Sequence, residues 1–94
     1  MESVKIVVVA LRPENVVRCL SIALKAKKYV KRYADVQIFL APSLNGFNGI
    51  AVEDETVVDC SDEDLSVEQI IEGVTKVVSK RKFVGLAIAA AKEI

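Results

Sequence analysis

Apolar residues along the chain form short runs that predict strands. Residues 4–11 are apolar except for Lys5 and rich in β-branched side chains, as is typical of a strand that is buried on both faces. Residues 36–40 predict a second strand, and residues 56–59 predict a short buried one. The pattern of residues 50–52 is ambiguous. Three strands are therefore expected before residue 60.

Helical periodicity follows the first of these strands. Pro13 suits the first turn of a helix, and the apolar residues after it recur every three or four positions, which predicts a long helix with one buried face. That face comprises Val16, Cys19, Leu20, Ala23, Ala26, Val30 and Tyr33, whereas the opposite face carries Arg18, Lys25, Lys28 and Arg32. Solvation explains this basic face better than nucleic-acid binding, because no aromatic side chains alternate with the cations.

The second half of the chain predicts two more helices with a strand between them. Ser66 and Gln69 have the spacing of a capping box, so a helix is expected to begin there and to end at Gly73. Residues 74–78 return to a β-branched pattern, and the alanines of residues 83–94 favour a last helix. The order β-α-β-β-α-β-α predicts a single α/β domain, residues 1–94, in which a parallel sheet of about four strands lies between two helical layers.

The composition of the chain also bears on its oligomeric state and its localisation. Apolar residues make up 52% of the chain, which favours a sheet covered on both faces or a subunit interface, so we expect a homo-oligomer. The longest apolar runs, residues 6–11 and 83–91, are shorter than the roughly 18 residues that a membrane span needs. The start of the chain lacks the basic segment of a signal peptide. We therefore expect a cytoplasmic protein without membrane association.

The charges are segregated, although the formal net charge is zero. Residues 1–42 carry eight Lys or Arg and three Asp or Glu, residues 43–72 carry nine acids and no base, and residues 73–94 carry five bases and one acid. Such blocks favour complementary contacts between subunits or with partner proteins. We do not expect a nucleic-acid surface.

Cys60 is the candidate for chemistry, because it stands where the expected strand 56–59 ends. The chain has no histidine, which excludes Ser/His and Cys/His catalysis and zinc sites that use histidine. In the cytoplasm Cys19 and Cys60 are expected to be reduced, and a disulfide between them would be the exception found in hyperthermophiles. Acids surround Cys60 in the sequence, so Arg12 is the candidate that stabilises a thiolate there.

Simpler explanations exist for each of these residues. Cys60 is explained equally well as a small apolar residue of the core, and Cys19 lies within the apolar helix face. The acids of residues 59–64 lack the glycine that a calcium loop needs for its sharp turn. Residues 45–49 contain two glycines but no Lys-Ser/Thr pair of a phosphate loop. We therefore expect no metal and no cofactor.

Two blocks of the sequence resemble the DsrE-like family, small α/β proteins related to the sulfur-relay components DsrE, DsrF and TusD. The first comprises the strand at residues 5–9, the Ala-rich helix at 20–28 and the segment DVQIFLAP at 35–42. The second comprises VVDC at 57–60, LSVEQIIEGV at 65–74 and the two valines at 77–78. The resemblance implies a DsrE-like fold in which Cys60 carries a persulfide and exchanges sulfur with a donor or acceptor protein.

Alternatives remain for both function and fold. The chain is also consistent with a DsrE-like binding or assembly subunit that has no chemistry. A ferredoxin-like βαββαβ interaction module would pair residues 50–52 with 56–59 as a hairpin and would make residues 83–88 the last strand. A thioredoxin-like fold is a third possibility, but the chain lacks a C-x-x-C motif and a proline before the third strand. The test is whether residues 74–78 form a strand and residues 83–92 a helix.

Overall fold

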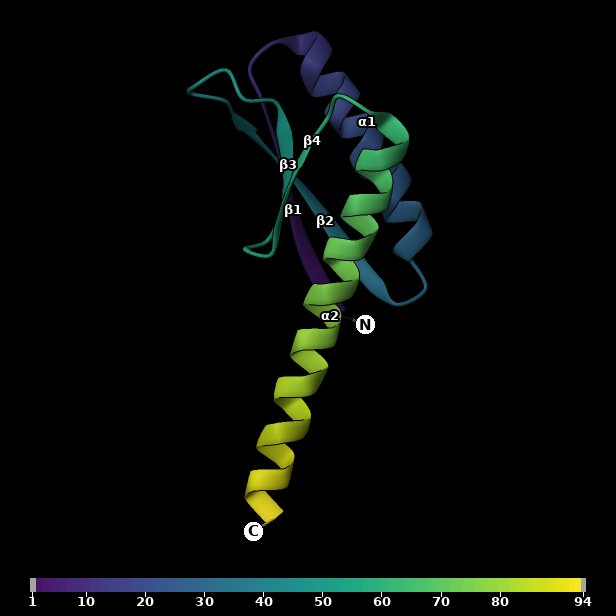
Figure 1. The fold of residues 1–94 in the computed structure, drawn as a ribbon, viewed down its shortest axis with the longest axis vertical. Coiled ribbons are helices and arrows are strands. Elements are labelled where there is room, and N and C mark those ends of the chain that lie inside the picture. Colours follow the sequence, from purple (N-terminus) through teal and green to yellow (C-terminus); the bar gives the residue numbers. More distant parts are fainter. Residues whose placement is uncertain (1, 94) are drawn as a thin grey trace.

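A computed structural model describes the backbone of residues 2–93 and the side chains of residues 2–82. The described residues form four strands and two helices. The elements, in chain order, are β1 (Glu2–Ala10), α1 (Pro13–Val30), β2 (Ala34–Pro42), β3 (Gly49–Val52), β4 (Thr56–Asp59) and α2 (Glu63–Glu93). Figure 1 shows that α2 continues well past the rest of the molecule.

The four strands form one mixed sheet in the order β2-β1-β3-β4. β1 and β2 are parallel, from Glu2 opposite Ala34 to Ala10 opposite Pro42, and α1 is the crossover between them. β3 runs antiparallel to β1, and β4 runs antiparallel to β3. The expected α/β class and the first βαβ unit are therefore confirmed, but the expectation of a wholly parallel sheet is wrong.

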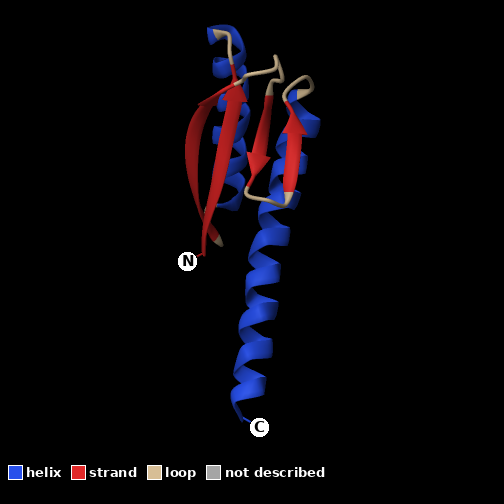
Figure 2. Cartoon of the chain, turned by 90° about the vertical axis from the view of Figure 1, so that its left-hand side faces the viewer, coloured by secondary structure: helices blue, strands red, loops and turns tan. Residues whose placement is uncertain are grey.

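Both helices pack on the same face of the sheet (Figure 2), so the molecule has two layers where three were expected. The core lies between these layers, because alternate strand residues point toward the helices. It includes Val4, Ile6 and Val8 of β1, Ile50 and Val52 of β3, and Cys19, Ile22, Ala23, Ala26 and Val30 of α1. The predicted buried face of α1 was correct at four of these positions. It missed Ile22 and wrongly included Tyr33, which is 38% exposed.

α2 replaces three predicted elements with one continuous helix of 31 residues. It begins at Glu63 and not at Ser66, because the Asp62 carboxylate accepts a hydrogen bond from the Leu65 amide at 3.1 Å and so caps the first turn. Gly73 does not end the helix. A Cβ at Gly73 would lie 3.2 Å from the Thr56 side chain, so this glycine allows α2 to approach the β3–β4 hairpin closely.

The predicted strand at residues 74–78 is wrong, because these residues form part of α2. Val74, Val77 and Val78 are buried, whereas Thr75 and Lys76 are exposed, and this is helical spacing. Residues 83–92 are helical as expected. The ferredoxin-like alternative correctly predicted the β3–β4 hairpin but lacks its last strand here.

Ion pairs fix α2 against the turn of the hairpin. Arg81 donates from Nη2 to both carboxylate oxygens of Glu53 at 2.7 and 2.8 Å, and from Nη1 to Glu2 and to the carbonyl of Ser3. Lys80 binds Glu55 at 2.8 Å. Part of the charge segregation along the chain is therefore matched within one molecule, where the basic run of α2 meets the acidic turn.

Replacing Arg81 with Met is expected to lower the free energy of unfolding by about 1 kcal/mol, since the pairs are charge-assisted but Arg81 is 37% exposed. Urea denaturation at low salt measures this loss, which salt should reduce. Lys82→Met removes the same charge one residue later and serves as the control. Equal losses in the two variants would contradict a specific role for Arg81.

Candidate functional site

Cys60, which directly follows β4, forms a disulfide with Cys19 of α1. The two Cα atoms are 5.5 Å apart, and 41 positions separate the residues in the sequence. Cys19 is fully buried and Cys60 is 3% exposed. The expectation of two reduced thiols is therefore wrong for this structure, because packing α1 on the sheet brings the buried face of the helix against the end of β4.

The acids around Cys60 hold the backbone in place. The Asp59 carboxylate accepts a hydrogen bond from the Ser61 amide at 2.9 Å, which forms a local turn immediately after β4. Ser66 is buried, and its hydroxyl donates to the carbonyl oxygen of Asp59. Together with the Asp62 cap, these bonds turn the chain from β4 into α2. The acidic stretch thus has a structural explanation that does not involve a thiolate.

Arg18 lines the same cavities as Cys60. The two cavities lie beside the disulfide and have volumes of about 290 and 140 Å³. The larger is also lined by Ser21, Ile22, Cys60, Ser61 and Glu63, and the smaller by Asn15, Cys19, Asn48, Asp59, Cys60 and Ser61. Sequence reasoning assigned Arg18 to the solvated face of α1. Because Arg18 directly precedes Cys19 in the sequence, its position could have indicated that it lies near the cysteines.

Arg12, the predicted partner of Cys60, lies at the beginning of α1. Its side chain is exposed, and its carbonyl oxygen accepts hydrogen bonds from the amides of Asn15 and Val16 at 3.0 Å. Its observed contribution is therefore to the first turn of the helix. A role for Arg12 in stabilising a Cys60 thiolate stays a prediction.

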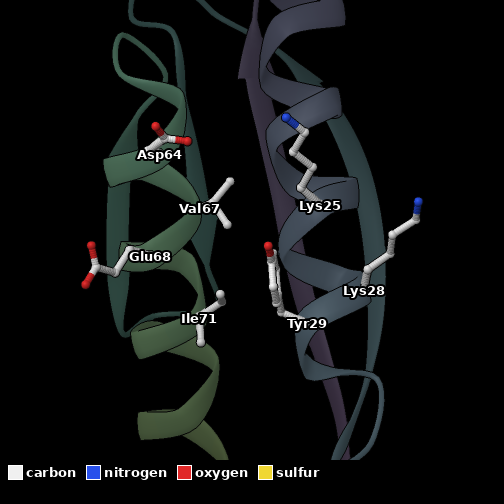
Figure 3. Close-up of a pocket in the computed structure, with 7 residues that line it drawn as sticks. All are labelled: Lys25, Lys28, Tyr29, Asp64, Val67, Glu68 and Ile71. Carbon is white, nitrogen blue, oxygen red and sulfur yellow. The ribbon is translucent and has the colours of Figure 1, made fainter.

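A groove of about 580 Å³ lies between α1 and α2. Figure 3 shows Val67 and Ile71 of α2 directed toward α1, whereas Glu68 and Lys28 point to opposite sides. Its lining comprises Lys25, Lys28 and Tyr29 from α1 and Asp64, Val67, Glu68 and Ile71 from α2. The charged groups do not converge on one point, so the groove lacks the polar arrangement that orients a small ligand.

An ion pair joins the two helices near this groove. Lys25 donates to Glu63 at 2.7 Å, and this hydrogen bond raises the pKa of Lys25 above its usual 10.5. A raised lysine pKa means that the pair stabilises the fold below pH 10.5 and that this contribution is lost as the pH rises through the higher folded-state value. Along the helices, the hydroxyls of Tyr33 and Thr75 are hydrogen-bonded at 3.0 Å.

The side of the sheet opposite the helices carries an apolar surface, which we call the open face. Strand pairing aligns Phe39, Val7, Ala51 and Val57 in one row across all four strands. The next row holds Ala41, Val9 and Gly49 and ends at the exposed Asp59 of β4, and the ring of Phe47 lies where a Cβ of Gly49 would be. Val57 is 67% exposed, Phe39 47% and Phe47 39%. The row on the other side of Val7 is polar, with Lys5 opposite Gln37.

Neither a metal site nor a membrane-spanning helix is found within the described residues. No group of three or more Cys, Asp or Glu side chains there is arranged to hold a metal ion. No helix in that part of the chain is long and apolar enough to cross a membrane. Comparison of the chain with models of protein families, with curated proteins and with solved structures finds no match.

Proposed function

We propose that this chain is a non-catalytic binding and assembly protein whose contact surface is the open face. One observation carries the proposal: both cysteines of the chain are buried in a disulfide, whereas a row of apolar side chains across the four strands is exposed at Phe39 and Val57 and partly exposed at Val7 and Ala51. A sheet with one solvated face normally alternates apolar residues inward with polar residues outward. A contiguous apolar surface on the outward side is typical of a protein interaction site.

In this proposal the disulfide is a structural crosslink. It joins α1 to the turn between β4 and α2, so it ties together the two halves of the layer that supports the sheet. Burial protects both sulfur atoms from exchange with thiols in solution. The crosslink therefore holds the sheet in the shape that presents the open face.

Sedimentation of the wild type and of Val57→Lys tests the proposal. We expect the wild type to sediment as a species heavier than the 10.2 kDa monomer and Val57→Lys to sediment as the monomer, because a buried unpaired lysine opposes association. Leu44→Ser is the matched control, since Leu44 is 97% exposed but lies in the loop between β2 and β3. A wild type that stays monomeric at all concentrations would overturn the proposal for self-assembly.

A second candidate function is the transfer of sulfane sulfur by Cys60 in the reduced protein. The observation that favours it is that Cys60 lines both cavities beside Arg18, whereas Cys19 lines only the smaller one. Cys60 is also 3% exposed, whereas Cys19 is fully buried. A Cys60 thiolate would attack the outer sulfur of a donor persulfide and release the donor thiol, and an acceptor thiolate would then take that sulfur and regenerate Cys60. The DsrE-like resemblance supports this role, although residues 74–78 do not form the strand that it implies.

Intact mass measurement tests the sulfur role. After reduction and incubation with a persulfide donor, a gain of about 32 Da, one sulfur atom, is expected in the wild type and in Cys19→Ser but not in Cys60→Ser. The Cys19→Ser variant is informative because it keeps Cys60 free of its disulfide partner. The absence of an adduct on the reduced protein would exclude the role.

A further inference from the structure

The groove between α1 and α2 has a basic edge and an acidic edge. Lys25 and Lys28 line it from α1, and Asp64 and Glu68 line it from α2 (Figure 3). All four side chains are exposed. Glu72 is also exposed and lies four residues after Glu68, so like charges follow one another along one side of α2, which is unfavourable in an isolated helix. A partner with the opposite charges would relieve this repulsion.

Contacts within one molecule match only part of these charges. Lys25 binds Glu63 at 2.7 Å, but among the ion pairs of residues 2–82 neither Lys28 nor Glu68 has a partner. Figure 3 shows the reason, because Lys28 and Glu68 point away from each other, toward the two outer sides of the groove. The segregation of bases and acids along the chain thus leaves unmatched charges on both edges.

The groove is apolar between its two edges. Val67 and Ile71 of α2 are directed toward α1, and the ring of Tyr29 lies between the two helices (Figure 3). Tyr29 is 70% exposed, so most of this large side chain faces solvent. An apolar centre with polar groups around it is the usual arrangement of a contact between proteins.

α1 and α2 run in the same direction, and hydrogen bonds between them fix their relative height. Lys25 contacts Glu63, and further along both helices Tyr33 contacts Thr75. The contacts advance together on the two helices, as expected of the parallel pair that Figure 1 shows. Residues that line the groove between these contacts therefore stand at similar heights on its two edges.

We propose that two copies of this chain pack groove to groove about a two-fold axis that runs along the groove. Rotation about this axis keeps the height of each residue and exchanges the two sides, so α1 of each copy lies over α2 of the other. Lys28 of each copy then meets Glu68 of the other. Tyr29, Val67 and Ile71 of both copies meet in the centre.

The charges select this axis over the alternative. A two-fold axis across the groove, at right angles to the helices, would place α1 over α1 and α2 over α2, so that bases would face bases and acids would face acids. The axis along the groove pairs a basic edge with an acidic edge twice. The groove is therefore complementary to itself, which is the reason to prefer a second copy over another occupant.

This contact is separate from the open face, because the helices lie on the other side of the sheet (Figure 2). It adds a second surface to the proposed assembly function and does not depend on the first. The apolar centre consists of only three side chains from each copy, so we expect the contact to form at higher protein concentration than assembly through the open face. Val57→Lys, which blocks the open face, is thus the protein in which to measure it.

Charge reversal in the Val57→Lys protein tests the inference by sedimentation equilibrium. We expect Val57→Lys to dimerise as its concentration is raised. Adding either Lys28→Glu or Glu68→Lys should raise the dissociation constant at least about tenfold, because like charges then face each other. An equal mixture of these two proteins should dimerise as Val57→Lys does, since each copy meets opposite charges on the other.

Lys27→Glu is the matched control, because Lys27 is exposed on α1 but does not line the groove. Circular dichroism of each variant verifies that the fold is retained. Equal weakening by Lys27→Glu and Lys28→Glu would indicate an effect of net charge and would overturn the inference.

The remaining outcomes separate the groove from the open face. A Val57→Lys protein that stays monomeric at every concentration, while the wild type assembles, rejects the groove contact and leaves the open face as the assembly surface. Single reversals whose mixture does not recover the dimer show that Lys28 and Glu68 do not meet between copies. Association that Val57→Lys leaves unchanged and Lys28→Glu abolishes supports the groove contact and rejects the open face.

Discussion

Reduction of the Cys19–Cys60 disulfide is expected to lower the free energy of unfolding by about 4 kcal/mol, because the crosslink spans 41 positions and its loss frees a loop of that size in the unfolded chain. For a domain of this length, such a loss corresponds to a decrease in melting temperature on the order of 20 °C. Thermal unfolding followed by circular dichroism, with and without a reductant, measures the effect. Much of the stability of a small domain thus depends on one bond.

The double variant Cys19→Ala, Cys60→Ala is the control for this experiment. It lacks the disulfide in every condition, so its melting temperature should not respond to the reductant and should lie near that of the reduced wild type. If the wild type melts at the same temperature after full reduction, as measured by thiol titration, the disulfide is not the crosslink that we describe. The same reduced sample decides whether dimerisation needs the crosslink.

The length of the connections, and not the strand pattern, determines how the sheet is built. The pattern of β1, α1 and β2 was sufficient to predict a parallel βαβ unit, because the helix between the strands returns the chain to the same edge. Residues 43–48 are too few to make that return, since a crossover needs about a dozen residues. β3 must therefore start at the same end of the sheet at which β2 stops, and so it runs antiparallel to β2 and β1. Three residues between β3 and β4 likewise favour a hairpin.

The candidate site was predicted only in part. The position of Cys60 at the end of β4 follows from local pattern and is confirmed. Its bond to Cys19 depends on how α1 lies across the sheet, which no local pattern contains, and the expected compartment pointed to free thiols. The open face could not be predicted from the sequence either. A run such as residues 6–9 suggests burial on both sides, but it cannot indicate whether the second side is covered by the same molecule.

The glycine and valine signals near residue 73 show how contacts in the folded protein override local preference. Gly73 followed by Val74, Val77 and Val78 resembles the end of a helix and the start of a strand. In the structure the same glycine brings α2 close to Thr56, and the valines pack against the core. Burial of the valines at helical spacing offsets their weak preference for helix.

Val77→Asp is therefore expected to lower the free energy of unfolding by roughly 3 kcal/mol or more, since Val77 is only 7% exposed and a carboxylate there would be buried without a partner. Lys76→Asp, one residue earlier on the exposed side of α2, should change stability little. If residues 74–78 formed a strand, Lys76 would lie on the same face as Val74 and Val78, and Val77 would lie on the other face with Thr75. An aspartate would then lower stability more at position 76 than at position 77. Urea denaturation of the two variants measures both effects. A larger loss of stability from Lys76→Asp than from Val77→Asp would favour the strand and contradict the continuous helix α2.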